Sequence, residues 1–568
     1  MRPLASAPGF APATAKDGLS RRSVALLLLI LALAAALRLV RLPEAPPGIH
    51  VDAAANAWNA NCIRQTGHDW SGASWPILYS RGFGENQTTL YYYALIPFQT
   101  VFGMSAVSTR LPSAFAGILS VWVIFAVGRR LFGTGVGLAA AAFLAVTPWH
   151  LFLSRWGQES GLVPLLSVLP LASLFWAGLL ATDDSESEPD RLRAGLAGIL
   201  TGVCCYGYPS VRVFVPALLI VLVVMNSRRL LALARTPKGG TAVAAFLLGL
   251  AVTFGPLAYS HLVDPEIAKR SHEFLVWDAG DPLLIKAGKA LARLPGHFGP
   301  DFLFVHGDRF PLHQLPASGP LPFWLAPLLA GGIVAAVWEA RTSRSARILL
   351  AWGAVYPLSD LFWKHDGMHL LRSAPGVCGF VLLAGLGAQR TWRFAVRRSR
   401  RAAALAAAVL VLCAAATTAW FLGSFFGEYN RRPDVYQLFN TDLLAASRII
   451  RARWDHVDAV FVSAGVSAAM DQPFVVVLVG AGYEPEQWLR DDKIVEHRAD
   501  TDLYRGFGKV RFLFDERDVA ELRALETNGR DDRVLLVLRP GEWEGLTPID
   551  EIDLPDGRPL FLIYETVM

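Results

Sequence analysis

Hydrophobic residues in this chain fall into blocks long enough to cross a lipid bilayer. The first block covers residues 23–42 and reads SVALLLLILALAAALRLVRL, which is about the twenty residues that a membrane helix needs. Further blocks follow at approximately residues 111–127, 137–153, 161–181, 194–208, 213–225, 241–259, 321–338, 348–363, 373–388 and 402–426. The pattern predicts a polytopic α-helical membrane protein with about eleven transmembrane helices.

The arginines between these blocks predict the orientation of the chain. If the N-terminus lies in the cytoplasm, the basic segments share its side, as the positive-inside rule requires. These segments lie at residues 21–22, 129–130, 191–193, 228–229, 341–347 and 390–401. Residues 90–102 (LYYYALIPFQTVF) are also apolar, but counting them as a span would invert every later basic segment. We therefore predict that they form a helix lying in the membrane interface.

The character of the chain changes after residue 426. Short β-rich runs at residues 459–463, 510–514, 534–538 and 560–564 alternate with helical patterns, and PDGRP is typical of a hairpin turn. The run QPFVVVLVGAGYEPEQWL (residues 472–489) fits either a buried strand or a helix. We predict a disordered cytoplasmic tail (residues 1–20), a membrane domain (21–426) with a large first outer loop (43–109), and an extracytoplasmic α/β domain (427–568).

Composition and charge agree with a plasma-membrane protein that crosses the bilayer several times. The chain has 568 residues, of which 53% are hydrophobic and only 18% charged, with a mean hydropathy of +0.37. The net charge of +5 does not indicate nucleic-acid binding, because the arginines cluster beside hydrophobic spans. The five cysteines lack the spacing of metal ligands or of a disulfide framework. No metal site or other cofactor is predicted, although a divalent metal stays possible.

Asp52, just beyond the first span, is the most informative polar residue. If AAANAWNA is helical, Asp52, Asn56 and Asn59 share one face of a helix at the membrane surface. The carboxylate could then accept a proton from an incoming hydroxyl. The alternative is a helix N-cap, because Asp is a preferred cap before an alanine-rich helix. The residue pattern alone leaves both open and favours the cap.

A series of motifs resembles the membrane glycosyltransferases of the dolichyl-phosphate-mannose protein mannosyltransferase type, relatives of the lipid A aminoarabinose transferases. They are a tGxDxxG-like stretch (residues 66–72), an FGDxxxPLYxY-like stretch (83–93), RLPSAxxG (110–117) and PWHxxxSR (148–155). The segments FLFVHGDRFPLHQLPASG and HDGMHLLRSAP are also similar to family segments. The resemblance implies the GT-C fold and transfer of a sugar from a polyprenyl-phosphate donor, with inversion, to a hydroxyl of a protein, lipid or envelope glycan.

The resemblance also implies roles for particular residues. Asp52, the acidic residue early in the first outer loop, is the expected general base. We expect donor phosphate or sugar contacts from Arg372, His369, Arg155, Glu85 and Tyr91, and loop contacts of uncertain role from Asp308, His313 and His150. The implied partners are a polyprenyl-phosphate-linked sugar, membrane lipids and an unidentified acceptor.

Two departures from the family pattern matter. Many relatives have Asp-Glu where this chain has Asp52-Ala53, so a second carboxylate is missing there. Relatives often have Lys-Pro-Pro where this chain has Gln87-Thr88-Thr89; if that lysine contacts the lipid phosphate, another cation must do so here. Two other classes stay open: a transporter or lipid flippase, although internal repeats are not evident, and a non-catalytic membrane scaffold.

Overall fold

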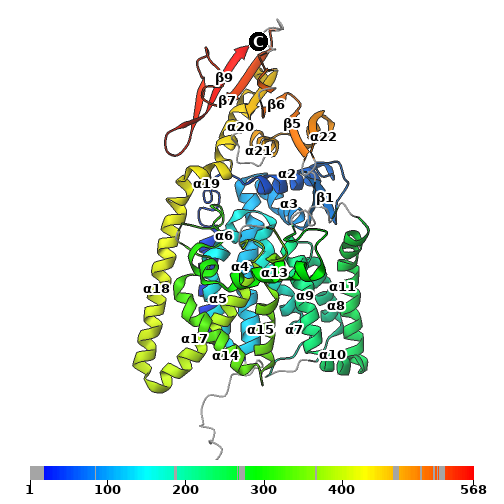
Figure 1. Ribbon diagram of the computed structural model, residues 1–568, viewed down its shortest axis with the longest axis vertical. Helices are drawn as coiled ribbons and strands as arrows, with labels where there is room; N and C mark the ends of the chain where they lie inside the picture. The colour runs from blue at the N-terminus through cyan, green and yellow to red at the C-terminus, as the bar shows by residue number, and fades with distance from the viewer. Residues whose placement is uncertain are drawn as a thin grey trace, which may run out of the picture.

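The computed structural model has a helical membrane part below a smaller domain that carries a mixed sheet (Figure 1). It describes residues 18–83, 85–183, 188–264, 267, 275–316, 318–364, 368–464, 472–498, 502–515, 518–520, 522–523 and 531–568. The predicted fold class, a polytopic helical protein with a C-terminal α/β domain, is confirmed.

Each predicted span contains helix. The membrane part consists of α1 (Arg21–Leu39), α4 (Ala106–Phe132), α5 (Thr134–Val146), α6 (Pro148–Trp156), α7 (Val163–Trp176), α8 (Arg191–Cys204), α9 (Pro209–Met225), α10 (Ser227–Ala234), α11 (Pro237–Val263), α13 (Leu283–Phe298), α14 (Ala326–Glu339), α15 (Arg344–Val355), α16 (Leu358–Leu361), α17 (Pro375–Arg398) and α18 (Arg400–Phe426).

The number of crossings is not settled by these helices. Five of the described helical stretches are long and apolar enough to cross a membrane, or seven if two bent pairs each count as one span. One of those pairs is α5 and α6, which meet at an angle of 60° just before Pro148. Proline there lacks a backbone N–H, so the straight span predicted for residues 137–153 is broken. The number of eleven transmembrane helices remains a prediction.

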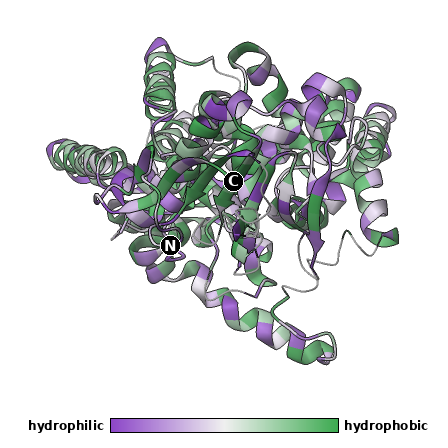
Figure 2. Ribbon diagram, turned by 90° about the horizontal axis from the view of Figure 1, so that it is seen from above, coloured by the Kyte–Doolittle hydropathy of each residue, from purple (hydrophilic) through white to green (hydrophobic). Residues whose placement is uncertain are grey.

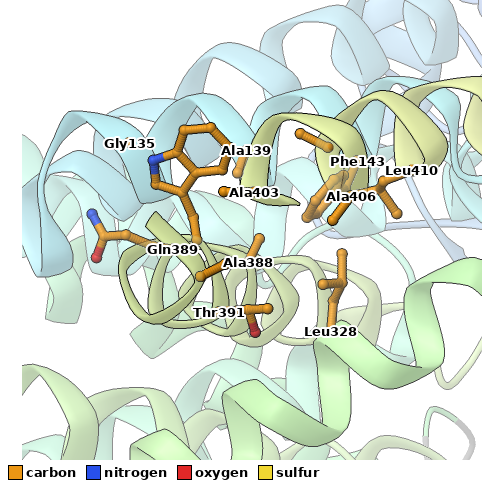
Figure 3. A pocket seen from close by; sticks show the side chains of 13 residues that line it. Gly135, Ala139, Phe143, Leu328, Ala388, Gln389, Thr391, Ala403, Ala406 and Leu410 are labelled. Carbon is orange, nitrogen blue, oxygen red and sulfur yellow. The ribbon is translucent and has the colours of Figure 1, made fainter. Parts of the chain in front are cut away.

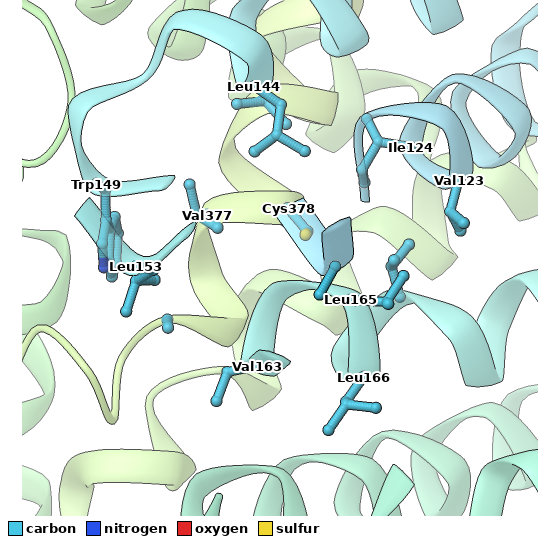
Figure 4. Packing of buried hydrophobic residues seen from close by; sticks show 14 of the residues in the cluster. Val123, Ile124, Leu144, Trp149, Leu153, Val163, Leu165, Leu166, Val377 and Cys378 are labelled. Atoms are coloured by element: carbon cyan, nitrogen blue, oxygen red, sulfur yellow. The ribbon is translucent and has the colours of Figure 1, made fainter. Parts of the chain in front are cut away.

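The core of the membrane part forms where α4, α5, α6, α7 and α17 meet. Ile124, Leu144, Leu153, Val163 and Val377 pack together there with almost no exposed surface (Figure 4). By contrast, Leu28 and Leu29 of α1 expose more than half of their surface. Apolar side chains that face outward in this way suit a lipid environment.

A layer of short elements lies between the membrane helices and the C-terminal domain (Figure 1). It contains α2 (Val51–Thr66), the antiparallel strands β1 (Tyr79–Gly82) and β2 (Glu85–Thr88), and α3 (Leu90–Phe102). The helix predicted at residues 90–102 is confirmed as α3. Its Tyr91 and Tyr92 side chains are fully buried against neighbouring elements.

The C-terminal domain is built on a seven-stranded sheet in the order β4-β5-β6-β3-β7-β9-β8. Strand β3 runs parallel to β6 and β7, and the other pairs are antiparallel. The strands are β3 (Ala459–Ser463), β4 (Lys493–His497), β5 (Asp502–Phe507), β6 (Val510–Leu513), β7 (Arg533–Leu538), β8 (Asp550–Asp553) and β9 (Pro559–Val567), and the helices are α19 (Pro433–Leu438), α20 (Thr441–Arg453), α21 (Pro473–Ala481) and α22 (Pro485–Arg490). The ambiguous run at residues 472–489 is thus helical, and PDGRP joins β8 and β9 as a hairpin.

The C-terminal domain packs directly on α2. The rings of Trp58 and Trp488 meet edge to face with centroids 6.4 Å apart, and Trp488 Nε1 donates to the carbonyl of Trp70 at 2.8 Å. Seen from above, the strands of the sheet lie over the helices (Figure 2). The helix that carries Asp52 and the C-terminal domain therefore share one side of the molecule.

Candidate functional site

Asp52 lies in the first turn of α2 with its carboxylate partly open to solvent. The N-cap is His50, whose Nδ1 accepts the backbone N–H of Asp52 at 3.3 Å, so the alternative that Asp52 caps the helix is wrong. The Asp52 side chain is 44% exposed, and its Oδ2 lies 3.6 Å from Nδ1 of His50. Burial is the main cause that lowers the pKa of His50, which keeps it neutral at neutral pH. Asp52 is therefore accessible to a ligand.

Glu159 supplies a second carboxylate beside Asp52. Nδ2 of Asn56 donates to Oε2 of Glu159 at 2.7 Å, and the Asp52 carboxylate lies close enough to Glu159 for the two charges to interact. Asn59, which we expected on the same polar face, instead accepts the backbone N–H of Trp70 at 3.1 Å. The sequence offered no signal for the pairing with Glu159, because the two carboxylates are 107 residues apart.

Arg372 lies at the same site as the two carboxylates. The Tyr208 hydroxyl lies within electrostatic range of the Arg372 guanidinium and of the carboxyl groups of Glu159, Asp52 and Asp360. The Arg372 guanidinium stacks over the Trp363 ring, with Cζ 4.4 Å from its centroid. A guanidinium supported from one side in this way suits a phosphate, to which it can donate paired hydrogen bonds.

The segment that carries Arg372 is held by side chains from other elements. Asp308 Oδ2 accepts the N–H of Leu370 at 3.0 Å, and Asp360 Oδ2 accepts the N–H of His369 at 2.8 Å. Ser359 Oγ donates to the carbonyl of Arg372 at 2.7 Å. These bonds define the position of the backbone from which Arg372 projects.

Asp308, His313 and His369 form one cluster. His313 bonds to the Asp308 carboxylate, and its ring centroid lies 5.2 Å from that of His369. Burial opposes ionisation of Asp308, but His313 and His369 outweigh it and lower its pKa. Burial, His313 and Arg372 lower the pKa of His369 to about 3, so it is uncharged at neutral pH. This leaves Arg372 rather than His369 as the cation suited to a phosphate.

Arg155 belongs to a different group, the arginine clamp, which we define as Arg38, Arg110 and Arg155, and His150 is a partner of this clamp. All three are almost completely buried. Arg155 donates to the carbonyls of Leu37, Val40, Arg41 and Ala45 at 2.9–3.1 Å. Arg110 donates to the carbonyls of Leu42 and Gly48, and Arg38 to Nδ1 of His150 at 2.7 Å. The structure therefore favours structural roles for Arg155 and His150.

The Tyr91 hydroxyl is also held by contacts within the fold. Its hydroxyl donates to the carbonyl of Thr109 at 2.9 Å and lies 2.8 Å from Oγ of Ser113. Glu85 begins β2 and its backbone pairs with Gly82, whereas its side chain lies outside the described residues. The stretch at residues 66–72 is a turn that follows α2, in which Asp69 accepts two backbone N–H groups and two hydroxyls.

Within the described parts of the chain, no three His, Cys, Asp or Glu side chains are grouped so that they could hold a metal ion. The two carboxylates of Asp52 and Glu159, the neutral His50 and His369, and the cation of Arg372 make up the candidate site. The site can accept a proton, bind hydroxyls and hold an anion.

Comparisons with known proteins agree with this fold. Residues 86–254 match the family model described as dolichyl-phosphate-mannose-protein mannosyltransferase. The structure is similar to that of ArnT from Cupriavidus metallidurans bound to undecaprenyl phosphate, with a TM-score of 0.53 and 13% identity over 95% of this chain and 98% of that chain. The apo state of the same ArnT gives a TM-score of 0.52 and 14% identity over the same shares. No curated protein sequence matches significantly.

These findings define the class as a multi-pass membrane protein with the GT-C glycosyltransferase fold. Residues 86–254 confirm the resemblance to the mannosyltransferase family over that segment, and the similarity to ArnT at 13–14% identity shows the fold.

Proposed function

We propose that this protein transfers a sugar from a polyprenyl-phosphate carrier to an acceptor hydroxyl at the side of the membrane where α2 and the C-terminal domain lie. The observation that carries the proposal is the grouping of a solvent-accessible carboxylate, Asp52, with the guanidinium of Arg372 around Tyr208. The match of residues 86–254 to a mannosyltransferase family supports the same reaction class.

In the proposed reaction the acceptor oxygen attacks the anomeric carbon of the sugar while the bond to the lipid phosphate breaks, which inverts the configuration. Asp52 accepts the proton of the acceptor hydroxyl, and Arg372 neutralises the negative charge that develops on the departing phosphate. Such a reaction needs a base and an anion partner at one site, and the electrostatic influence of both Asp52 and Arg372 on Tyr208 supports this assignment.

Glu159 takes the place of the carboxylate that is missing at Ala53. Asn56 holds its carboxylate through the 2.7 Å bond, so its free lone pairs can accept hydroxyl groups of the sugar or acceptor. The neutral His50 and His369 can each donate one N–H without adding charge.

We further propose that the N-terminus is cytoplasmic and that α2 and the C-terminal domain are extracytoplasmic. Reporter fusions after Arg130 and Arg229 should then indicate the cytoplasm, and fusions after residues 265 and 568 the outside. A cytoplasmic reporter signal at Met568 would place the site on the wrong side for an extracytoplasmic acceptor.

The reaction class is tested by a transfer assay. Membranes with and without the protein are supplied with radiolabelled polyprenyl-phosphate sugars, and label in non-lipid and lipid acceptors is measured. We expect protein-dependent transfer accompanied by release of polyprenyl phosphate. Movement of the intact labelled lipid between leaflets without transfer would instead identify a flippase, and neither activity would favour a scaffold.

A further inference from the structure

An apolar cavity lies in the membrane part, between helices α5, α14, α17 and α18 (Figure 3). Its volume is about 430 Å³, within the range of small-molecule sites, which hold about 300–1,000 Å³. Thirteen residues line it: Gly135, Ala139, Phe143, Leu328, Ala388, Gln389, Thr391, Trp392, Ala395, Ala403, Ala406, Ala407 and Leu410. Nearly all are apolar, so the cavity suits a hydrocarbon chain.

One end of this cavity adjoins a strongly basic turn. The lining residues Ala395 and Ala403 flank the short connection between α17 and α18. Six arginines occupy residues 390–401. Among them, Arg390 is held by Glu339 through two bonds of 2.6 and 2.7 Å, and Arg398 stacks over Phe394.

The remaining arginines of the turn are exposed. Arg393, Arg397, Arg400 and Arg401 all lie at the surface, close in sequence to the cavity-lining residues of α17 and α18, and the last three lie nearest the connection between the two helices. Clusters of arginine beside a membrane helix attract anionic lipid head groups, and a guanidinium binds phosphate through paired hydrogen bonds. The turn and the cavity together therefore match a molecule with a hydrocarbon chain and a negative head group.

We propose that this cavity and the basic turn beside it bind a membrane phospholipid with an anionic head group. Its acyl chain lies between α5, α14, α17 and α18, and its phosphate contacts Arg397, Arg400 and Arg401. The positive-inside rule explains why arginines occur on this side, but it requires no cavity beside them. The site lies at the opposite end of the helices from α2 (Figure 1), so the proposal does not depend on sugar transfer.

The test measures lipid bound to the purified full-length chain by native mass spectrometry. The probes are dioleoylphosphatidylglycerol and dioleoylphosphatidylcholine, which differ in head-group charge but not in acyl chains. We expect at least about tenfold tighter binding of the anionic lipid. The triple variant Arg397→Gln, Arg400→Gln, Arg401→Gln should remove this preference, because each basic residue contributes to the attraction.

Two matched controls distinguish binding at this cavity from a general attraction of anionic lipid to exposed arginines. The triple variant Arg191→Gln, Arg228→Gln, Arg235→Gln removes three exposed arginines at α8 and the ends of α10 and should keep the preference. Ala406→Phe fills the cavity and should weaken binding of both lipids, whereas Ala404→Phe, on the exposed face of α18 outside the cavity, should not.

Equal binding of the two lipids, or an equal loss in both arginine variants, would overturn the proposal. Capture of polyprenyl phosphate alone, in a form that resists exchange with phosphatidylglycerol, would also overturn it. Elution volume and melting temperature report whether Ala406→Phe is folded, and the arginine variants test the site without altering the helix packing.

Discussion

Arginine serves opposite purposes in two neighbouring regions of this protein. In the arginine clamp, Arg38, Arg110 and Arg155 are buried, and their guanidinium groups donate to carbonyls and to side chains within the fold. At the candidate site, Arg372 is only partly buried and stacks on the ring of Trp363. The guanidinium groups of the clamp stabilise the chain through its carbonyls, whereas that of Arg372 stacks on a ring beside the candidate site.

The clamp and the site are nevertheless connected. Arg110 and Arg155 hold the carbonyls of Leu37 to Gly48, and the next residues are His50, which caps α2, and Asp52. A Cβ added at Gly117 would lie 2.2 Å from Oγ of Ser154, so the clamp also needs glycine there. The motifs at residues 110–117 and 148–155 thus position the loop that carries the proposed base.

The largest effect is expected at Asp52. Asp52→Asn keeps the shape of the side chain but cannot accept a proton, so the rate of sugar transfer should fall about 100-fold to 10,000-fold. Stability should fall by no more than about 1 kcal/mol, because only a favourable charge near the N-terminus of α2 is lost. Glu44→Gln, which removes an exposed carboxylate of the same loop, is the control and should transfer normally. Substantial sugar transfer by Asp52→Asn would indicate that Glu159, rather than Asp52, is the general base.

The next effect separates the two kinds of arginine. Arg372→Lys keeps the charge but loses the paired donors, so KM for the lipid donor should rise about tenfold at an unchanged melting temperature. Arg155→Lys should instead lower the melting temperature and leave KM for the lipid donor unchanged. The loss of its carbonyl contacts should cost the equivalent of about 2 kcal/mol of stability. A raised KM for the lipid donor in Arg155→Lys would indicate that Arg155 contacts the donor.

A smaller effect is expected from pH at His369. Its pKa in the folded protein is about 3, whereas an unfolded histidine titrates near about 6.5. Between these values the unfolded chain binds a proton that the folded protein does not, so stability decreases as the pH falls. His369→Gln cannot titrate and should lose less melting temperature than wild type between about pH 7.5 and pH 5. Parallel profiles would show that His369 is not held neutral.

The smallest effect is expected at Tyr91. Tyr91→Phe removes the bonds to Thr109 and Ser113 and should reduce the free energy of unfolding by about 1 kcal/mol with little change in transfer rate. Tyr92→Phe, which removes a bond to Gln87, provides a matched comparison. A large loss of transfer in Tyr91→Phe alone would restore Tyr91 to the sugar-binding residues.

Much of the architecture follows from local patterns in the sequence. Blocks of apolar residues predicted the helices, and alternating runs after residue 426 predicted strands β3, β6, β7 and β9, because both depend on short-range periodicity. The helix α3 was predicted from the short length of its apolar stretch and from the positions of the basic segments that follow it. Asp52 could be singled out because it follows the first span in a recognisable series of motifs.

The sequence by itself therefore determined the class of protein and most of its helices and strands, and it singled out Asp52 as the candidate base. Only the tertiary structure decided which ionisable residues meet. Asn56 of α2 binds Glu159 within electrostatic range of Asp52, Asp308 and Asp360 hold the segment of Arg372, and Arg155 binds the end of α1. The physical reason is that an arginine or a carboxylate has the same local sequence pattern in any loop, whereas its role depends on the partners that packing brings to it. Two of these partners, Glu159 for Asn56 and Arg155 for Leu37, lie more than a hundred residues away in the sequence.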